Sequence, residues 1–88
     1  MPYISQELRK DVDDRIDALN NIVQYYDEEV IDGVMNYIIT RLMRANYNLG
    51  HYWQYNSAIG VLECAKLELY RRVIGPYEDI KIIENGDV

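Results

Sequence analysis

The chain is 88 residues long, is 49% hydrophobic and carries a formal net charge of −6. This length and composition predict one small globular domain over residues 1–88 and exclude a disordered chain. Surfaces that bind duplex nucleic acid are usually basic, so the acidic balance argues against that class of function.

The first predicted helix begins after Ser5, a favourable N-cap residue, with Gln6 and Glu7 in its first turn. Apolar residues then recur at helical spacing for about five turns, with charged residues between them. The expected buried stripe consists of Leu8, Val12, Ile16, Leu19, Ile22 and Val23. We expect this helix to end at residues 25–27.

The second predicted helix is capped by Asp27, and Glu28 and Glu29 lie against the positive end of its dipole. Its expected buried stripe consists of Ile31, Val34, Met35, Ile38, Leu42 and Met43. Residues 37–40 would also suit a strand, because three of the four are β-branched. Their flanks keep the helical period, so a helix is favoured.

Residues 46–55 are the one predicted loop, because Asn and Gly favour turns. Four of these residues are aromatic: Tyr47, Tyr52, Trp53 and Tyr55. Such side chains either pack over the ends of helices or stack on a nucleobase, and the sequence leaves both interpretations open.

Asn56 or Ser57 is expected to cap a third helix, which should end at Gly75 and Pro76 because glycine favours helix ends and proline lacks an N–H donor. Pro76 would then begin a short fourth helix closed by residues 85–86, with a short strand at residues 80–83 as the alternative. The sequence therefore predicts an all-α fold, a small bundle of three main helices plus a short C-terminal helix. Because so short a chain has a small core, we expect it to be a homo-oligomer.

The third helix is apolar on two sides. One stripe, assigned to the core, consists of Ala58, Leu62, Ala65, Leu69 and Val73. The other consists of Gly60, Glu63, Leu67, Tyr70 and Ile74, with Lys66 and Arg71 at its edges. Since a helix apolar on two sides must be covered on both, the second stripe is expected to pack against another subunit or the C-terminal helix. In that case Glu63–Lys66 and Glu68–Arg72 are ordinary intrahelical ion pairs.

The alternative is that the second stripe forms the floor of a ligand pocket, in which basic residues hold an anion and tyrosines stack on a base. The candidate ligand-binding residues are Asn56, Glu63, Lys66, Tyr70, Arg71, Arg72 and Tyr77. Residues 34–75 carry a net charge of +3, which favours a small anionic ligand. The same basic residues would also suit pairing with residues 1–33, whose net charge is −6.

Metal and enzyme sites have little support in the sequence. Cys64 is the single cysteine and His51 the single histidine, which excludes an internal disulfide and a cysteine-based zinc site. Phosphate-loop and nucleophile-elbow motifs are missing as well. We therefore expect a non-enzymatic protein without metal or cofactor, and keep catalysis by Glu63 with Lys66 or Tyr70 as a minor alternative. With no signal peptide and no long apolar run, we expect a cytoplasmic location and no membrane partner.

Several segments together resemble a family of small uncharacterised bacterial and phage proteins, a domain of unknown function. The similar segments are residues 1–4, 36–40, 55–72, 76–79 and 84–88, and the run from Tyr55 to Arg72 is the most specific. This resemblance implies no activity. In size and helical content the chain is also similar to unrelated short phage proteins that oligomerise and sequester the nucleotide signals of bacterial immune systems, an analogy and not a homology.

Two functions are consistent with these features. The first is a non-enzymatic helical oligomer that binds a small phosphorylated ligand at a subunit interface, for example as a sponge for a nucleotide signal. The second is a phage or mobile-element interaction module that binds another protein through the tyrosine-rich loop and the C-terminal tail, without a small-molecule ligand.

Overall fold

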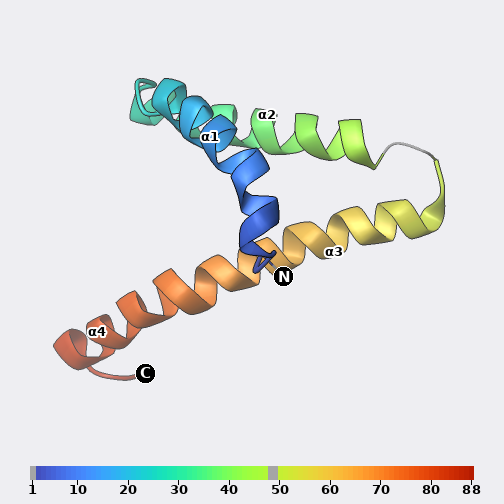
Figure 1. Cartoon of the computed structure of the whole chain (residues 1–88). Coiled ribbons are helices and arrows are strands. Elements are labelled where there is room, and N and C mark those ends of the chain that lie inside the picture. Colours follow the sequence, from blue (N-terminus) through green and yellow to red (C-terminus); the bar gives the residue numbers. More distant parts are fainter. Residues whose placement is uncertain (1, 48–49) are drawn as a thin grey trace.

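The computed structural model describes residues 2–47 and 50–88 (Figure 1). The elements are α1 (Gln6–Val23), α2 (Glu28–Asn46), α3 (Tyr52–Leu69), a π-helical turn (Tyr70–Ile74) and α4 (Gly75–Asn85). Within the described residues every regular element is a helix, so the all-α prediction is confirmed. The strand alternative at residues 80–83 is wrong, because these residues lie inside α4.

The first two helices begin where the sequence predicts. The Ser5 side chain accepts a hydrogen bond from the backbone N–H of Leu8 at 3.3 Å, which caps α1. Asp27 occupies the N-cap position of α2 without a side-chain capping bond, and Glu28 and Glu29 lie in the first turn. These carboxylates favour the N-terminus through the helix dipole even where the cap itself is not bonded.

The predicted loop is too long. The N-cap of α3 is His51, so Tyr52, Trp53 and Tyr55 belong to a helix and not to a loop. Asn56 and Ser57, the expected caps, lie inside that helix. The turn before it contains Gly50 at φ 74°, a left-handed conformation that glycine adopts without a steric penalty. Asn48 and Leu49, which the loop prediction included, lie outside the described residues.

The helical segment that begins with α3 does not end at Gly75 and Pro76 as predicted. After Leu69 the backbone forms a wider, π-helical turn, in which the Gly75 N–H donates to the carbonyl of Tyr70, five residues earlier. A Cβ atom at Gly75 would lie 3.3 Å from that carbonyl oxygen, so this turn favours glycine. Pro76 falls in the first turn of α4, where its missing N–H does least harm. As a result α3, the π-turn and α4 form one long rod (Figure 1).

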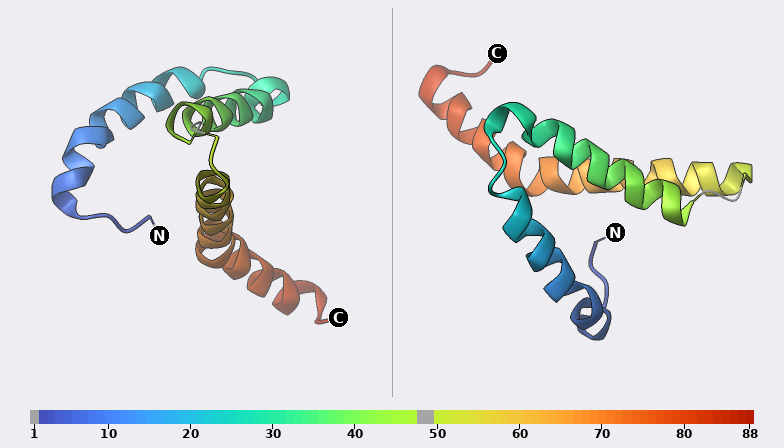
Figure 2. Two further views of the ribbon diagram at one scale, coloured as in Figure 1. Left: turned by 90° about the vertical axis from the view of Figure 1, so that its right-hand side faces the viewer. Right: turned by 90° about the horizontal axis from the view of Figure 1, so that it is seen from above.

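The arrangement of these helices is open. The radius of gyration is 16.6 Å, against about 12 Å for a compact domain of this length. In both views of Figure 2, α2 runs back above α3, whereas α1 swings out to one side. The N-terminal segment then returns to the middle of the rod (Figure 1). The helices therefore form an open frame, in which they are separated, and do not pack together as the predicted bundle.

The expected core stripes are mostly exposed in this single chain. Val23 is the one buried apolar side chain among the described residues, while Leu69 and Val73 of the predicted core stripe are 56% and 58% exposed. Their assignment to a core within the chain is wrong, because no second helix is laid along that side of the rod. The accessible surface is 8053 Å², against about 5,400 Å² for a compact protein of this mass. Every helix in the described part of the chain is too short or too polar to cross a membrane.

Candidate functional site

Two of the predicted ligand-binding cations are held by neighbouring carboxylates on the rod. Lys66 Nζ lies 2.9 Å from Glu63 Oε1, so the predicted pair is confirmed. Arg71 Nη2 lies 3.3 Å from Glu68 Oε2, so Glu68 pairs one residue earlier than expected. Surface ion pairs of this kind stabilise a protein by only about 0.2–1 kcal/mol, but they reduce the positive charge that a ligand would meet.

Arg72 is directed toward the N-terminal segment. The Tyr3 hydroxyl donates to the Glu68 carboxylate and accepts a hydrogen bond from Arg72 Nη1 at 3.4 Å. Pro2 and Tyr3 also line a hollow with Leu69 on the same part of the rod. These contacts join residues more than sixty positions apart and attach the beginning of the chain to α3.

The two candidate tyrosines are also engaged within the rod. The Tyr70 hydroxyl donates to the Glu78 carboxylate across the π-turn. This hydrogen bond, together with the negative charge of Glu78, raises the pKa of the Tyr70 hydroxyl above its ordinary value. The ring of Tyr77 has Lys81 Nζ at 5.6 Å from its centroid, within reach of a cation–π interaction.

The predicted set therefore extends along the rod. Asn56 and Tyr77 are twenty-one residues apart, which corresponds to roughly 30 Å of helix. One small ligand cannot contact both ends of that span. In addition Arg71 and Arg72 line different hollows, the first beside Pro2 and Cys64 and the second beside Tyr3. Within the chain, the structure does not bring the seven residues into one site.

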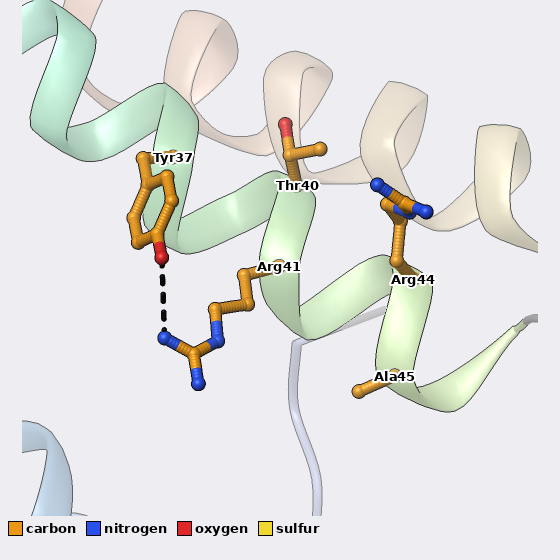
Figure 3. A pocket seen from close by; sticks show the side chains of 5 residues that line it. All are labelled: Tyr37, Thr40, Arg41, Arg44 and Ala45. Carbon is orange, nitrogen blue, oxygen red and sulfur yellow. Dashed lines mark hydrogen bonds between the residues drawn. The ribbon is translucent and has the colours of Figure 1, made fainter.

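A different cluster lies on α2. A hollow of about 540 Å³ is lined by Tyr37, Thr40, Arg41, Arg44 and Ala45, and Figure 3 shows their side chains. Positions separated by three, four and seven residues share one face of a helix, which explains why these residues line the same hollow. In the sequence, Arg41 and Arg44 stand out only as two of the five bases within residues 34–75. The signal that could have found the site is the regular spacing of Tyr37, Arg41 and Arg44.

The cations of this cluster have a different environment from those on the rod. Arg41 Nη1 donates to the Tyr37 hydroxyl at 3.2 Å, and its guanidinium carbon lies 6.0 Å from the centroid of the Tyr37 ring. Within the described residues, neither Arg41 nor Arg44 is in ion-pair distance of a carboxylate, whereas Lys66 and Arg71 both are. The positive charge of this face is therefore uncompensated by a direct partner.

The other candidate chemistries gain nothing from the geometry. In the part of the chain that the structure describes, no group of three or more His, Cys, Asp or Glu side chains is placed to hold a metal ion. His51 stands at the start of α3, and Cys64 is exposed on the rod.

Comparison with known proteins identifies the family but no activity. A family model described as "Domain of unknown function (DUF6899)" matches residues 1–88, so the chain belongs to this family. The predicted resemblance to a domain of unknown function is thereby confirmed. No curated protein and no solved structure matches the chain.

Proposed function

We propose that this chain is one subunit of a non-enzymatic helical homo-oligomer that binds a small phosphorylated ligand where subunits meet. The observation that carries the proposal is the exposed surface. The accessible area of 8053 Å² exceeds that of a compact protein of this mass by roughly 2,700 Å². Obligate homodimers bury about 2,000–5,000 Å² in total, so the excess is on the scale that such an assembly covers.

The exposed surface is apolar in the places that a helix normally buries. On the rod, Ile59 is 65% exposed and Leu67 is 54% exposed; on α1, Leu8 and Ile16 are 56% and 57% exposed. These residues recur at the helical period that indicates packing. Exposed apolar side chains at these positions support the proposal of an interaction surface.

A second copy is the partner that the charge distribution favours. Residues 1–33 carry a net charge of −6 and residues 34–75 carry +3. Because the single chain leaves its helices apart, the acidic face of α1 and the basic residues of the rod are both accessible to another molecule. If the acidic segment of one copy lies against the basic segment of the next, the opposite charges attract the two copies and also fix their relative orientation.

A binding role suits the polar groups better than a catalytic one. The minor catalytic alternative places Glu63 beside Lys66, and the two form an exposed ion pair on the rod. A catalytic pair usually lies in a cleft that shifts the pKa values of its members. Basic residues beside tyrosines, by contrast, are the groups that hold a phosphate and a base. Sequestration of a nucleotide signal, in the manner of the phage sponges, is the biological role that we propose for such a protein.

Native mass spectrometry of protein taken directly from cells tests this proposal. We expect an oligomer that carries a co-purified molecule with the mass of a phosphorylated compound. A thermal-shift panel of nucleotides should then identify stabilising ligands, because binding to the folded state raises the unfolding temperature. A monomer that unfolds cooperatively, carries no small molecule and is stabilised by no nucleotide would refute it.

One observation favours the alternative function, an interaction module for a different protein. At the end of α1, Ile22, Tyr25 and Tyr26 line a mainly apolar hollow of about 320 Å³, and Tyr25 is 83% exposed. Exposed tyrosines are typical of protein interfaces. The same native mass spectrum distinguishes the two functions, since the alternative requires one stoichiometric foreign chain and no small molecule.

A further inference from the structure

We infer that Arg41 and Arg44, supported by Tyr37, form a nucleotide-binding site on α2, in which the two arginines bind the phosphate groups. The inference rests on the proposed function and deepens it, since it replaces the predicted set on the rod with a defined site. It also defines the ligand class as a nucleotide, whose base lies against the Tyr37 ring.

The helical spacing of α2 places the required residues on one face of the helix. Tyr37, Arg41 and Arg44 are separated by four and three residues, so all three project from one face over two successive turns. Figure 3 shows the Arg41 side chain extending toward the Tyr37 hydroxyl, with Arg44 one turn further along. The hollow that they line, about 540 Å³, lies within the range of about 300–1,000 Å³ that small-molecule sites occupy.

The charge of the site selects an anion. The whole chain is acidic, yet the lining of this hollow contains two arginines and no carboxylate. On the rod, by contrast, Lys66 and Arg71 each form an ion pair with a glutamate three residues earlier. A phosphate that approaches Arg41 and Arg44 therefore displaces no internal ion pair. The flat guanidinium group also presents paired donors that match two phosphate oxygens.

Hydrogen bonds define which groups remain for the ligand. Arg41 uses one donor on the Tyr37 hydroxyl at 3.2 Å, which fixes the direction of the guanidinium and leaves its other donors for a phosphate. The Thr40 hydroxyl donates to Asn36 Oδ1 at 3.1 Å, so it lines the hollow but does not offer its proton to the ligand. Tyr37 is thus a positioning residue, and the two arginines are the direct contacts.

The Tyr37 ring suits the other half of a nucleotide. It is 62% exposed, and Arg41 lies near the ring at 6.0 Å from its centroid. Base–aromatic stacking tolerates any base, so the ring supports recognition of the class and not of one nucleotide. A ligand held on so exposed a face gains from a neighbouring subunit that closes over it, as the proposed oligomer would provide.

Isothermal titration calorimetry of the full chain with ADP tests the site, with inorganic pyrophosphate and adenosine as the separate halves of the probe. Arg41→Ala and Arg44→Ala should each weaken ADP binding by about 10- to 100-fold, the loss of one charge-assisted contact. Arg15→Ala is the matched control, because it removes the same charge from α1, where Arg15 bonds to the Asp11 carbonyl. Circular dichroism should show unchanged helix content in all three variants, since alanine is the best helix former.

Two further variants separate positioning from direct contact. Tyr37→Phe keeps the ring and removes the hydroxyl, so it should weaken pyrophosphate binding while adenosine binding stays unchanged. Tyr37→Ala should weaken both. If Tyr37→Phe leaves pyrophosphate binding unaltered, the positioning role is wrong.

The same titrations tell failure of this site from failure of the proposed function. If ADP binding survives in Arg41→Ala and Arg44→Ala but is lost in the Lys66→Ala, Arg71→Ala double variant, the inference is overturned and the proposed function stands with its site on the rod. If the wild-type protein binds neither ADP nor pyrophosphate, the site on α2 is refuted. The oligomer and its co-purified molecule, measured by native mass spectrometry, then decide the proposed function independently.

Discussion

The most direct test of coupled folding and assembly is the removal of apolar groups from the rod. In the single chain Leu67 is 54% and Ile74 is 36% exposed, and both belong to the stripe expected to face another subunit. Replacing both by alanine deletes three carbons at each position, and burial of a carbon is worth about 0.8 kcal/mol. Scaled by the exposed fractions, the double variant loses roughly 2.2 kcal/mol per subunit, or about 4.3 kcal/mol across a two-fold interface, which corresponds to about a thousandfold weaker association.

The substitution isolates burial from backbone effects, because alanine has a higher helix propensity than leucine or isoleucine. An isolated helix would therefore become more stable, whereas an assembled one should become less stable. Analytical ultracentrifugation over a range of concentrations measures the association, and circular dichroism measures the unfolding temperature. For a folding-coupled oligomer that temperature should rise with protein concentration. Lys10→Ala is the control, since Lys10 lies on an exposed polar face and pairs only with Glu7.

The reasoning is refuted by one clear result. A wild-type chain that stays monomeric at high concentration, with an unfolding temperature independent of concentration and unaltered by Leu67→Ala with Ile74→Ala, would show that the exposed stripe needs no cover.

Three more predictions concern single positions. Gly33→Ala should raise the free energy of unfolding by about 1 kcal/mol, because a Cβ atom there meets nothing within 4 Å. Gly75→Ala should gain less, because its Cβ atom would lie 3.3 Å from a carbonyl oxygen. Thermal unfolding of the two variants measures the difference in stability between them. The pKa of the Tyr70 hydroxyl lies above its ordinary value near 10, so the hydrogen bond to Glu78 stabilises the fold fully below that value and is lost as the pH rises through the raised pKa. In Glu78→Gln, a tyrosine-selective NMR titration should show the pKa of Tyr70 moving back down. An unchanged pKa would contradict the assigned cause. Tyr3→Phe removes the hydroxyl that joins the N-terminal segment to the rod, so hydrogen exchange in that segment should accelerate while α2 is unaffected; equal protection in both proteins would show that this contact does not hold the segment.

Local signals in the sequence predict the helix ends when one residue decides the end by itself. Ser5 caps α1 through its own side chain, and Gly86, at φ 89°, follows the last residue of α4. Both ends depend on chemistry within a few residues, namely a hydroxyl acceptor at the start and a left-handed glycine at the finish. For that reason the sequence alone was sufficient.

The same rules fail where a helix has an alternative to stopping. Gly75 and Pro76 together indicate an end, but a π-helical turn accommodates both, since the wider turn uses a bond to the carbonyl five residues back. Asn56 and Ser57 are good caps that remain inside α3, because His51 already starts the helix one turn and more before them. Propensity describes whether a residue favours a helix end or a cap, but the backbone of the adjacent turn determines whether the helix ends there.

The candidate site shows a related limit. Composition identified residues 34–75 as the basic part of the chain, but it could not say which bases lie next to carboxylates in space. Lys66 and Arg71 have an acid three residues before them on the same helix face, and both are paired. Arg41 has a tyrosine four residues before it, one turn away, and binds its hydroxyl instead. At these three positions, the residue one turn earlier on the helix determines whether the cation pairs with a carboxylate or with a hydroxyl.

Helical periodicity reports which side of a helix is covered, but not which molecule covers it. The stripe on α1 and both stripes on the rod have the period of buried residues, yet Leu8, Leu67 and Val73 are each more than half exposed in the single chain. A sequence selected only as a monomer would gain solubility from polar residues at such positions, whereas here they remain apolar on every long helix. The proposed second copy would reconcile the period with the exposure, since a frame of separated helices leaves space along its sides for the helices of another subunit.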